Sequence, residues 1–101
     1  MESRGRYNMA LQQVAGDKIA HIVVYSLSTC SQCRNAKQLL SDLHIEFFFE
    51  DVDVLGEEDQ RNVMVEVSRW NPRRSFPTIV VNNKQVIIGY DEVELRRLST
   101  L

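Results

Sequence analysis

The chain has 101 residues, of which 44% are hydrophobic and 26% are charged, and its formal net charge is −2 at pH 7. This length suits one globular domain. So small a net charge, with both signs mixed along the chain, excludes a role that depends on neutralising nucleic-acid phosphates. No apolar run follows Arg4 and Arg6 as in an export signal, and none has the length of a membrane span. We expect a monomeric protein of the cytoplasm that binds neither nucleic acid nor membrane.

Residues 1–20 carry no strong hydrophobic period, and we predict a flexible N-terminal extension with a short helical turn near Met9 to Val14. The domain itself is expected over residues 21–101. His21–Tyr25 is a β-branched run that predicts a buried strand. After it, apolar residues recur every three or four positions and predict an amphipathic helix. These residues are Cys33, Ala36, Leu39, Leu40 and Leu43.

Ile45 to Val54 has strand character, and its three consecutive phenylalanines indicate that both faces of the strand are covered. Strand, helix and strand make a βαβ unit, whose crossover is expected to be right-handed and whose strands are expected to be parallel. Glu57 to Trp70 predicts a second helix, because acidic residues fill its first turn and apolar residues follow at helical spacing. Asn71-Pro72 ends that helix.

Thr78–Val81 and Gln85–Ile88 are apolar runs separated by Asn82-Asn83-Lys84, and asparagine tolerates the positive φ of a hairpin turn. Asp91 with Glu94 three residues later forms the capping pattern of a last helix. The inward-facing residues of this helix are expected to be Val93, Leu95 and Leu98. The predicted order is β, α, β, α, β, β, α, which is an α/β fold.

Cys30 and Cys33 are the two cysteines of the chain, and they stand where the first predicted strand gives way to the first helix. The first NH groups of a helix lack backbone partners and stabilise negative charge. Helix N-termini and nearby cations favour the thiolate form of a cysteine, and Arg34 and Lys37 add positive charge here. We interpret Cys30 as a nucleophile that attacks disulfides and Cys33, which faces the core, as the resolving thiol.

A structural disulfide and a zinc site are the alternatives for this cysteine pair. A disulfide that closes a loop of four residues restricts the unfolded chain by only about 2 kcal/mol. Zinc requires four ligands, and beyond the cysteines only His21, His44 and scattered acids remain, without the spacing of a ligand pair. We therefore expect no metal at the pair and no tightly bound cofactor.

Three separated motifs together resemble the glutaredoxin family over about residues 20–101. They are Val23-Val24-Tyr25-Ser26 followed by Thr29-Cys30-Ser31-Gln32-Cys33-Arg34-Asn35-Ala36-Lys37, then Phe76-Pro77-Thr78, and then Gly89-Tyr90-Asp91. The resemblance implies a thioredoxin fold, in which a four-stranded mixed sheet is flanked by three helices. It also implies glutathione as the usual co-substrate and electron source.

The resemblance further implies a surface that binds glutathione or a protein substrate beside the cysteines. Pro77 matches the family's cis-proline, before which the backbone of Phe76 presents its NH and carbonyl to an extended substrate. Gly89-Tyr90-Asp91 matches the segment that binds the γ-glutamyl group through free amides and an acid, although Asp91 also suits a plain N-cap. Arg73 and Arg74 suit the glycine carboxylate of glutathione, although loop arginines are more often solvated.

Three departures from the family pattern bear on the use of glutathione. Leu27 stands where glutaredoxins often have a lysine, Ser31-Gln32 replaces Pro-Tyr, and Ile88 replaces the first glycine of a Gly-Gly pair.

The predicted activity is the reduction of protein disulfides or glutathione mixed disulfides by the Cys30/Cys33 dithiol. Two alternatives stay open. One is a redoxin that takes electrons from thioredoxin reductase and serves ribonucleotide reductase, which the Gln32-Cys33 ending resembles. The other is a glutathione-assisted iron–sulfur module.

Overall fold

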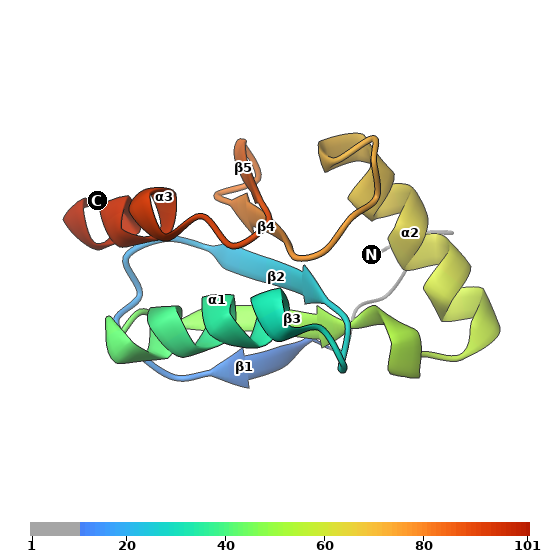
Figure 1. The fold of residues 1–101 in the computed structure, drawn as a ribbon, viewed down its shortest axis with the longest axis horizontal. Coiled ribbons are helices and arrows are strands. Elements are labelled where there is room, and N and C mark those ends of the chain that lie inside the picture. Colours follow the sequence, from blue (N-terminus) through green and yellow to red (C-terminus); the bar gives the residue numbers. More distant parts are fainter. Residues whose placement is uncertain (1–10) are drawn as a thin grey trace, which may run out of the picture.

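The computed structural model describes residues 11–101, which form a five-stranded mixed sheet and three α-helices (Figure 1). The strands are β1 (Gln12–Val14), β2 (Ile22–Ser26), β3 (Phe47–Asp51), β4 (Thr78–Val81) and β5 (Gln85–Ile88). The helices are α1 (Ser31–Asp42), α2 (Glu57–Trp70) and α3 (Glu92–Arg97), with 3₁₀ turns at Val52–Val54 and Leu98–Thr100. The sheet order is β1-β3-β2-β4-β5, and β2 with β3 is the one parallel pair of neighbouring strands among the described residues. The α/β class and the parallel βαβ unit are confirmed.

The fifth strand corrects the four-stranded sheet that the sequence predicted. Gln12–Val14 lies where a helical turn was expected, and it pairs antiparallel with Phe47–Phe49. Asp17 extends this contact: its amide donates to the carbonyl of His44 at 2.7 Å, and its carbonyl accepts from the amide of Glu46 at 2.9 Å. The sheet therefore begins before residue 21. Residues 1–10, with Arg4, Arg6 and Met9, lie outside the described residues.

Alternate residues of the central strand face two separate apolar clusters. Ile22 and Val24 of β2 pack into the cluster covered by α1 and α3, whereas Val23 and Tyr25 pack into the cluster covered by α2. The three phenylalanines at the start of β3 divide between the two clusters in the same way. Figure 1 shows α1 and α3 lying along the same side of the sheet. Both faces of the sheet are covered, as the unbroken apolar runs predicted.

Most of the predicted element limits agree with the structure, and the start of α3 agrees in its chemistry as well. The Oδ1 atom of Asp91 accepts a hydrogen bond from the amide of Glu94 at 3.1 Å, as the capping pattern predicted. Leu95 and Leu98 are buried as expected. Val93 is 62% exposed, which corrects its predicted inward position. Residues two apart on a helix do not share a face, so Val93 cannot point inward together with Leu95.

Two connections show how the chain leaves the strands. The strand predicted to run to Val54 ends at Asp51, because Val52–Val54 form a 3₁₀ turn that directs the chain toward α2. Between β4 and β5, Asn82 and Asn83 have φ angles of 54° and 56°, so the predicted asparagine hairpin is confirmed.

None of the helices in the described part of the chain is both long and apolar enough to cross a membrane.

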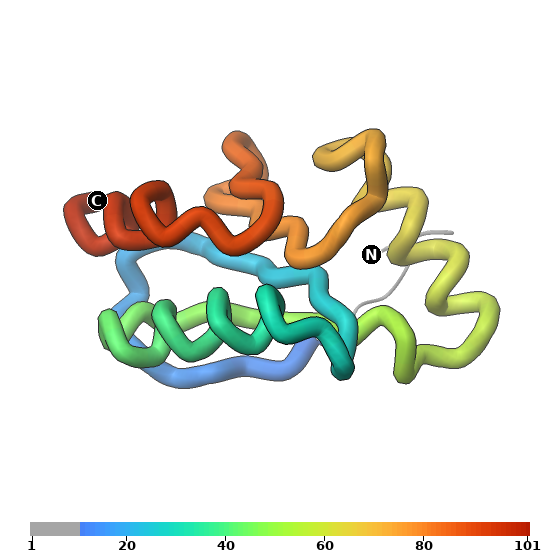
Figure 2. Tube along the Cα trace, viewed as in Figure 1, coloured from blue at the N-terminus to red at the C-terminus, as the bar shows by residue number. Residues whose placement is uncertain are grey.

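The strand register places the ends of three strands beside one another. Tyr25, near the end of β2, pairs with Thr78 at the start of β4, and Thr78 pairs with Ile88 at the end of β5. The loops that adjoin these residues therefore lie at one end of the sheet (Figure 2). These loops are residues 27–30 before α1, 71–77 before β4 and 89–91 before α3.

Gly16 provides a test of the edge strand. A Cβ atom at this position would lie 2.6 Å from the amide nitrogen of Glu46 and 2.7 Å from the carbonyl carbon of Ile45. Since these are backbone atoms held by the hydrogen bonds of Asp17 with His44 and Glu46, we expect Gly16→Ala to lower the free energy of unfolding by about 1–3 kcal/mol. Urea unfolding followed by circular dichroism measures this change.

Gly56 offers the matched control, because a Cβ atom there would meet nothing within 4 Å. As Gly56 is the N-cap of α2, the alanine variant is expected to lose less than about 1 kcal/mol. Equal stability of the two alanine variants would contradict the placement of residues 12–17 against β3.

Candidate active site

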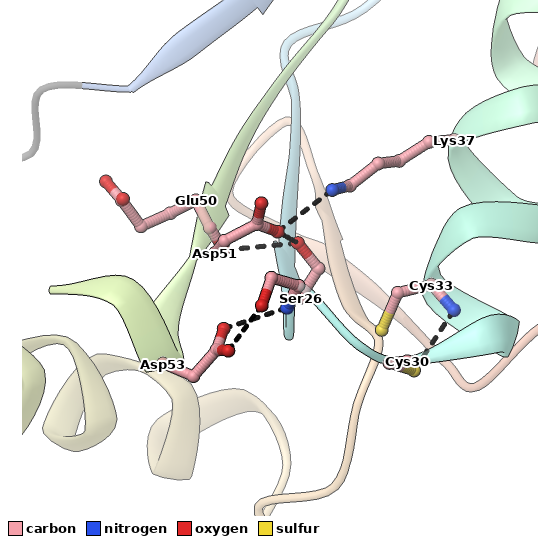
Figure 3. A network of polar contacts seen from close by, with 8 residues as sticks. Ser26, Cys30, Cys33, Lys37, Glu50, Asp51 and Asp53 are labelled. Atoms are coloured by element: carbon pink, nitrogen blue, oxygen red, sulfur yellow. Dashed lines mark hydrogen bonds and ion pairs between the residues drawn. The ribbon is translucent and has the colours of Figure 1, made fainter.

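Cys30 is the N-cap residue of α1, and its side chain replaces the oxygen that usually caps a helix. Its backbone is extended, with φ −91° and ψ 118°, and its Sγ accepts a hydrogen bond from the amide of Cys33 at 3.1 Å (Figure 3). Its carbonyl accepts from the amide of Arg34 at 3.1 Å and so begins the helix. An amide of the first helical turn that has no backbone partner therefore points at the sulfur and stabilises negative charge that develops there.

Cys33 differs from Cys30 in exposure. Both thiols are free, but Cys30 is partly exposed and Cys33 is fully buried. Burial raises the pKa of Cys33 to about 12, with a further contribution from its hydrogen bond to Cys30, while a backbone hydrogen bond with Leu27 and the charge of Lys37 act in the opposite direction. Cys33 is therefore a protonated thiol near neutrality. This asymmetry agrees with the predicted roles of an accessible nucleophile and a buried resolving thiol.

Lys37 supplies a cation on the inner side of α1, four residues after Cys33. Its Nζ lies 2.9 Å from the Oδ1 of Asp51 and 4.0 Å from the ring centroid of Phe49, and its side chain is only 21% exposed. The same Oδ1 accepts a hydrogen bond from the Oγ of Ser26 at 2.6 Å. Figure 3 shows Lys37 extending from α1 toward β3. The ion pair thus holds the ammonium at Asp51 of β3, from where its charge acts to lower the pKa of Cys33. Arg34, the other predicted cation, is exposed.

Asp53 anchors the loop that leads from β2 into Cys30. Its carboxylate accepts one hydrogen bond from the Oγ of Ser28 at 2.5 Å and another from the amide of Ser28 at 2.8 Å. These two bonds hold the pKa of Asp53 below its usual range. Because Asp53 belongs to the 3₁₀ turn after β3, the cysteine loop is tied to the neighbouring strand.

Asn71, which was not predicted as a site residue, organises the loop before β4. It is 1% exposed, and its Nδ2 donates to the carbonyl of Ser75 at 3.1 Å and to the Oγ1 of Thr78 at 3.0 Å. The peptide bond between Phe76 and Pro77 within this loop is cis, which confirms the expectation from the family resemblance. A buried asparagine with several partners makes the position of the loop specific.

The structure joins the three predicted motifs through two hydrogen bonds. The amide of Gly89 donates to the carbonyl of Pro77 at 2.8 Å, so the loop after β5 contacts the loop before β4. The amide of Tyr90 donates to the Oε1 of Gln32 at 3.4 Å, so the same loop also contacts the start of α1. Gly89 has φ +80°, a conformation that favours glycine. The Gln32 contact was missed, because nothing in the sequence relates residues this far apart.

The remaining predicted site residues lie at the rim of this arrangement. Arg73 and Arg74 are exposed in the loop before Pro77, and Arg74 has φ 54°. The amide of Arg73 donates to the Oδ1 of Asn71 at 3.1 Å. Their expected contact with a ligand carboxylate stays a prediction. Within residues 11–101, no third cysteine, histidine or acid joins the cysteine pair in a group that could hold a metal ion.

The family model that matches the chain is Glutaredoxin, over residues 22–86. The chain belongs to the glutaredoxin family. The matched segment includes the cysteine pair, the cis-proline and most of the sheet.

Relatives of this glutaredoxin include plant and archaeal proteins. Glutaredoxin-C6 of Oryza sativa subsp. japonica is 31% identical over 67 residues, which are 66% of this chain and 58% of that protein. The chain spans about three-fifths of the length of this relative and of a glutaredoxin of Vernicia fordii.

Two archaeal structures resemble the chain over most of its length. Methanoredoxin of Methanosarcina acetivorans is 38% identical with a TM-score of 0.85, covering 94% of this chain and 99% of that chain. The glutaredoxin of Methanosarcina mazei Go1 is 35% identical with a TM-score of 0.82, covering 90% of this chain and 88% of that chain.

The ionisation of Cys33 leads to a prediction about pH. Burial is the largest cause of the raised pKa of Cys33. We expect this burial to remain when Cys30 carries a mixed disulfide, so that only a small fraction of Cys33 is thiolate near neutrality. That fraction grows tenfold per pH unit below the pKa, so the rate at which Cys33 displaces the group from Cys30 should rise about a hundredfold between about pH 7 and pH 9.

Stopped-flow mixing with an aromatic disulfide, which releases a coloured thiolate at each step, separates this second release from the first. Cys33→Ser should lack the second release at every pH. A second release whose rate does not change over this pH range would contradict a protonated Cys33.

Proposed function

We propose that this glutaredoxin is a thiol–disulfide oxidoreductase that works through the Cys30/Cys33 dithiol. The thiolate of Cys30 attacks one sulfur of a substrate disulfide, so that a bond forms between Cys30 and that sulfur, and the other substrate sulfur leaves and takes up a proton. Cys33 then loses its proton and attacks the Sγ of Cys30, which releases the second substrate thiol. The pair ends as a disulfide and the substrate has gained two electrons.

One observation carries this proposal: the amide of Cys33 donates to the Sγ of Cys30 at 3.1 Å, while the thiol of Cys33 is fully buried. A disulfide substrate can approach Cys30 but cannot reach Cys33 until Cys30 has reacted. The order of the two steps follows from this difference in access.

The substrates of this proposal are protein disulfides and glutathione mixed disulfides, with glutathione as the thiol that restores the reduced pair. The cytoplasm is the proposed compartment, because glutathione there keeps such dithiols reduced. The proposed binding surface consists of the loops that meet beside the cysteines. Its residues are Arg73, Arg74, Phe76, Pro77, Gly89, Tyr90 and Asp91.

Serine variants of the two cysteines test the assignment of roles. Cys30→Ser should lower turnover of every disulfide by at least about a hundredfold, because it removes the attacking sulfur. Cys33→Ser should retain exchange with glutathione mixed disulfides and lose most of the reduction of disulfides within a protein, which requires the resolving thiol. Turnover assays with a glutathionylated peptide and with insulin measure both. Full activity of Cys30→Ser would refute the assignment.

The electron source is tested by driving turnover either with glutathione and glutathione reductase or with thioredoxin reductase. Turnover with the glutathione system supports the proposal, whereas turnover with thioredoxin reductase alone would favour a redoxin. Iron together with a visible charge-transfer band after anaerobic purification would favour the iron–sulfur module.

A further inference from the structure

Gln32 reaches across the site to the loop after β5. It stands between the two cysteines, directly before Cys33. Its Oε1 accepts the hydrogen bond from the amide of Tyr90 at 3.4 Å. The same oxygen lies 3.7 Å from the place that a Cβ atom on Gly89 would occupy, so the side chain packs against the backbone of this loop. The motif that carries the nucleophile therefore occupies an amide of the adjacent loop.

A ligand joined to Cys30 that is recognised through a carboxylate at the loop after β5 needs an N–H donor in that loop. The amide of Tyr90 is such a donor. An oxygen of a side-chain amide and an oxygen of a carboxylate compete for the same N–H group. The ligand must displace Gln32 before it gains the bond, so the net gain is the difference between two hydrogen bonds.

The neighbouring groups of the loop keep the Tyr90 amide beside Gln32. The amide of Gly89 donates to the carbonyl of Pro77 at 2.8 Å, which ties the loop after β5 to the loop before β4. The Oδ1 of Asp91 is engaged by the amide of Glu94 at 3.1 Å, which ties the loop to α3. The residues on both sides of Tyr90 therefore have hydrogen-bond partners that favour this position of its amide.

We propose that Gln32 is a specificity-determining residue: by occupying the amide of Tyr90, it weakens recognition of the γ-glutamyl carboxylate and makes the enzyme tolerant of thiols other than glutathione. This inference rests on the proposed function, because it concerns which thiol is joined to Cys30. The preference among thiols is then set within the cysteine motif, where Ser31-Gln32 stands between Cys30 and Cys33.

The reaction that reports this preference is the first exchange step. The Cys30 thiolate attacks the sulfur of the small thiol in a peptide mixed disulfide, the bond between Cys30 and that sulfur forms, and the peptide thiolate leaves and is protonated. Two substrates share this chemistry: a peptide joined to glutathione and the same peptide joined to cysteinylglycine, which lacks the γ-glutamyl group. The ratio of their kcat/KM values isolates recognition of that group, since changes in cysteine reactivity cancel.

We expect the wild-type protein to use both substrates with similar kcat/KM. Gln32→Ala, which frees the amide, should raise the ratio in favour of the glutathione substrate by about threefold to tenfold. Gln32→Glu should lower the ratio below the wild-type value, because it places a carboxylate where the ligand carboxylate would bind. Gln38→Ala is the control: Gln38 is an exposed glutamine of α1 that is bonded to Asp42 at 2.9 Å, and its removal should leave the ratio unchanged.

The possible results separate this inference from the proposed function. Opposite changes of the ratio in Gln32→Ala and Gln32→Glu support the role of Gln32. A ratio that stays within about twofold of wild type in both variants, with turnover intact, overturns it and leaves the oxidoreductase assignment in place. Absence of turnover with either substrate in the wild-type protein would overturn the proposed function and this inference together.

Discussion

The hydrogen bond from the amide of Cys33 to the Sγ of Cys30 is the constraint on which the site depends. It exists because Cys30 stands at the N-cap of α1, where a helix has amide donors without partners. The same turn of helix places the thiol of Cys33 in the core, where burial keeps it protonated. One local geometry therefore gives the two sulfurs different access, which a sequential exchange reaction requires.

The surrounding contacts position this helix start against three loops at one end of the sheet. Loops have no ladder to satisfy their backbone groups, so side chains and single backbone bonds hold them. Asp53 holds the loop before Cys30, Asn71 holds the loop before Pro77, and the bond between Gly89 and Pro77 joins the remaining loop to them. Gln32 completes the arrangement and, in our proposal, also shapes which thiols it accepts.

The sequence predicted the features that depend on neighbouring residues. The limits of α2 follow from a local period, the cap of α3 from Asp91 and Glu94, and the position of the cysteine pair at the start of α1 from the strand-to-helix pattern around it. It did not predict β1, because Gln12–Val14 is short, largely polar and recognisable only by its pairing with Phe47–Phe49. The Gln32–Tyr90 contact was missed for the same reason: it joins segments that only the fold brings together.

The most direct test of this account is alkylation of the reduced, folded protein near neutral pH with iodoacetamide, followed by peptide mass mapping over time. The account predicts that Cys30 is modified while Cys33 remains unmodified until the protein is unfolded. Modification of Cys33 at a rate equal to or above that of Cys30 in the folded protein would contradict it.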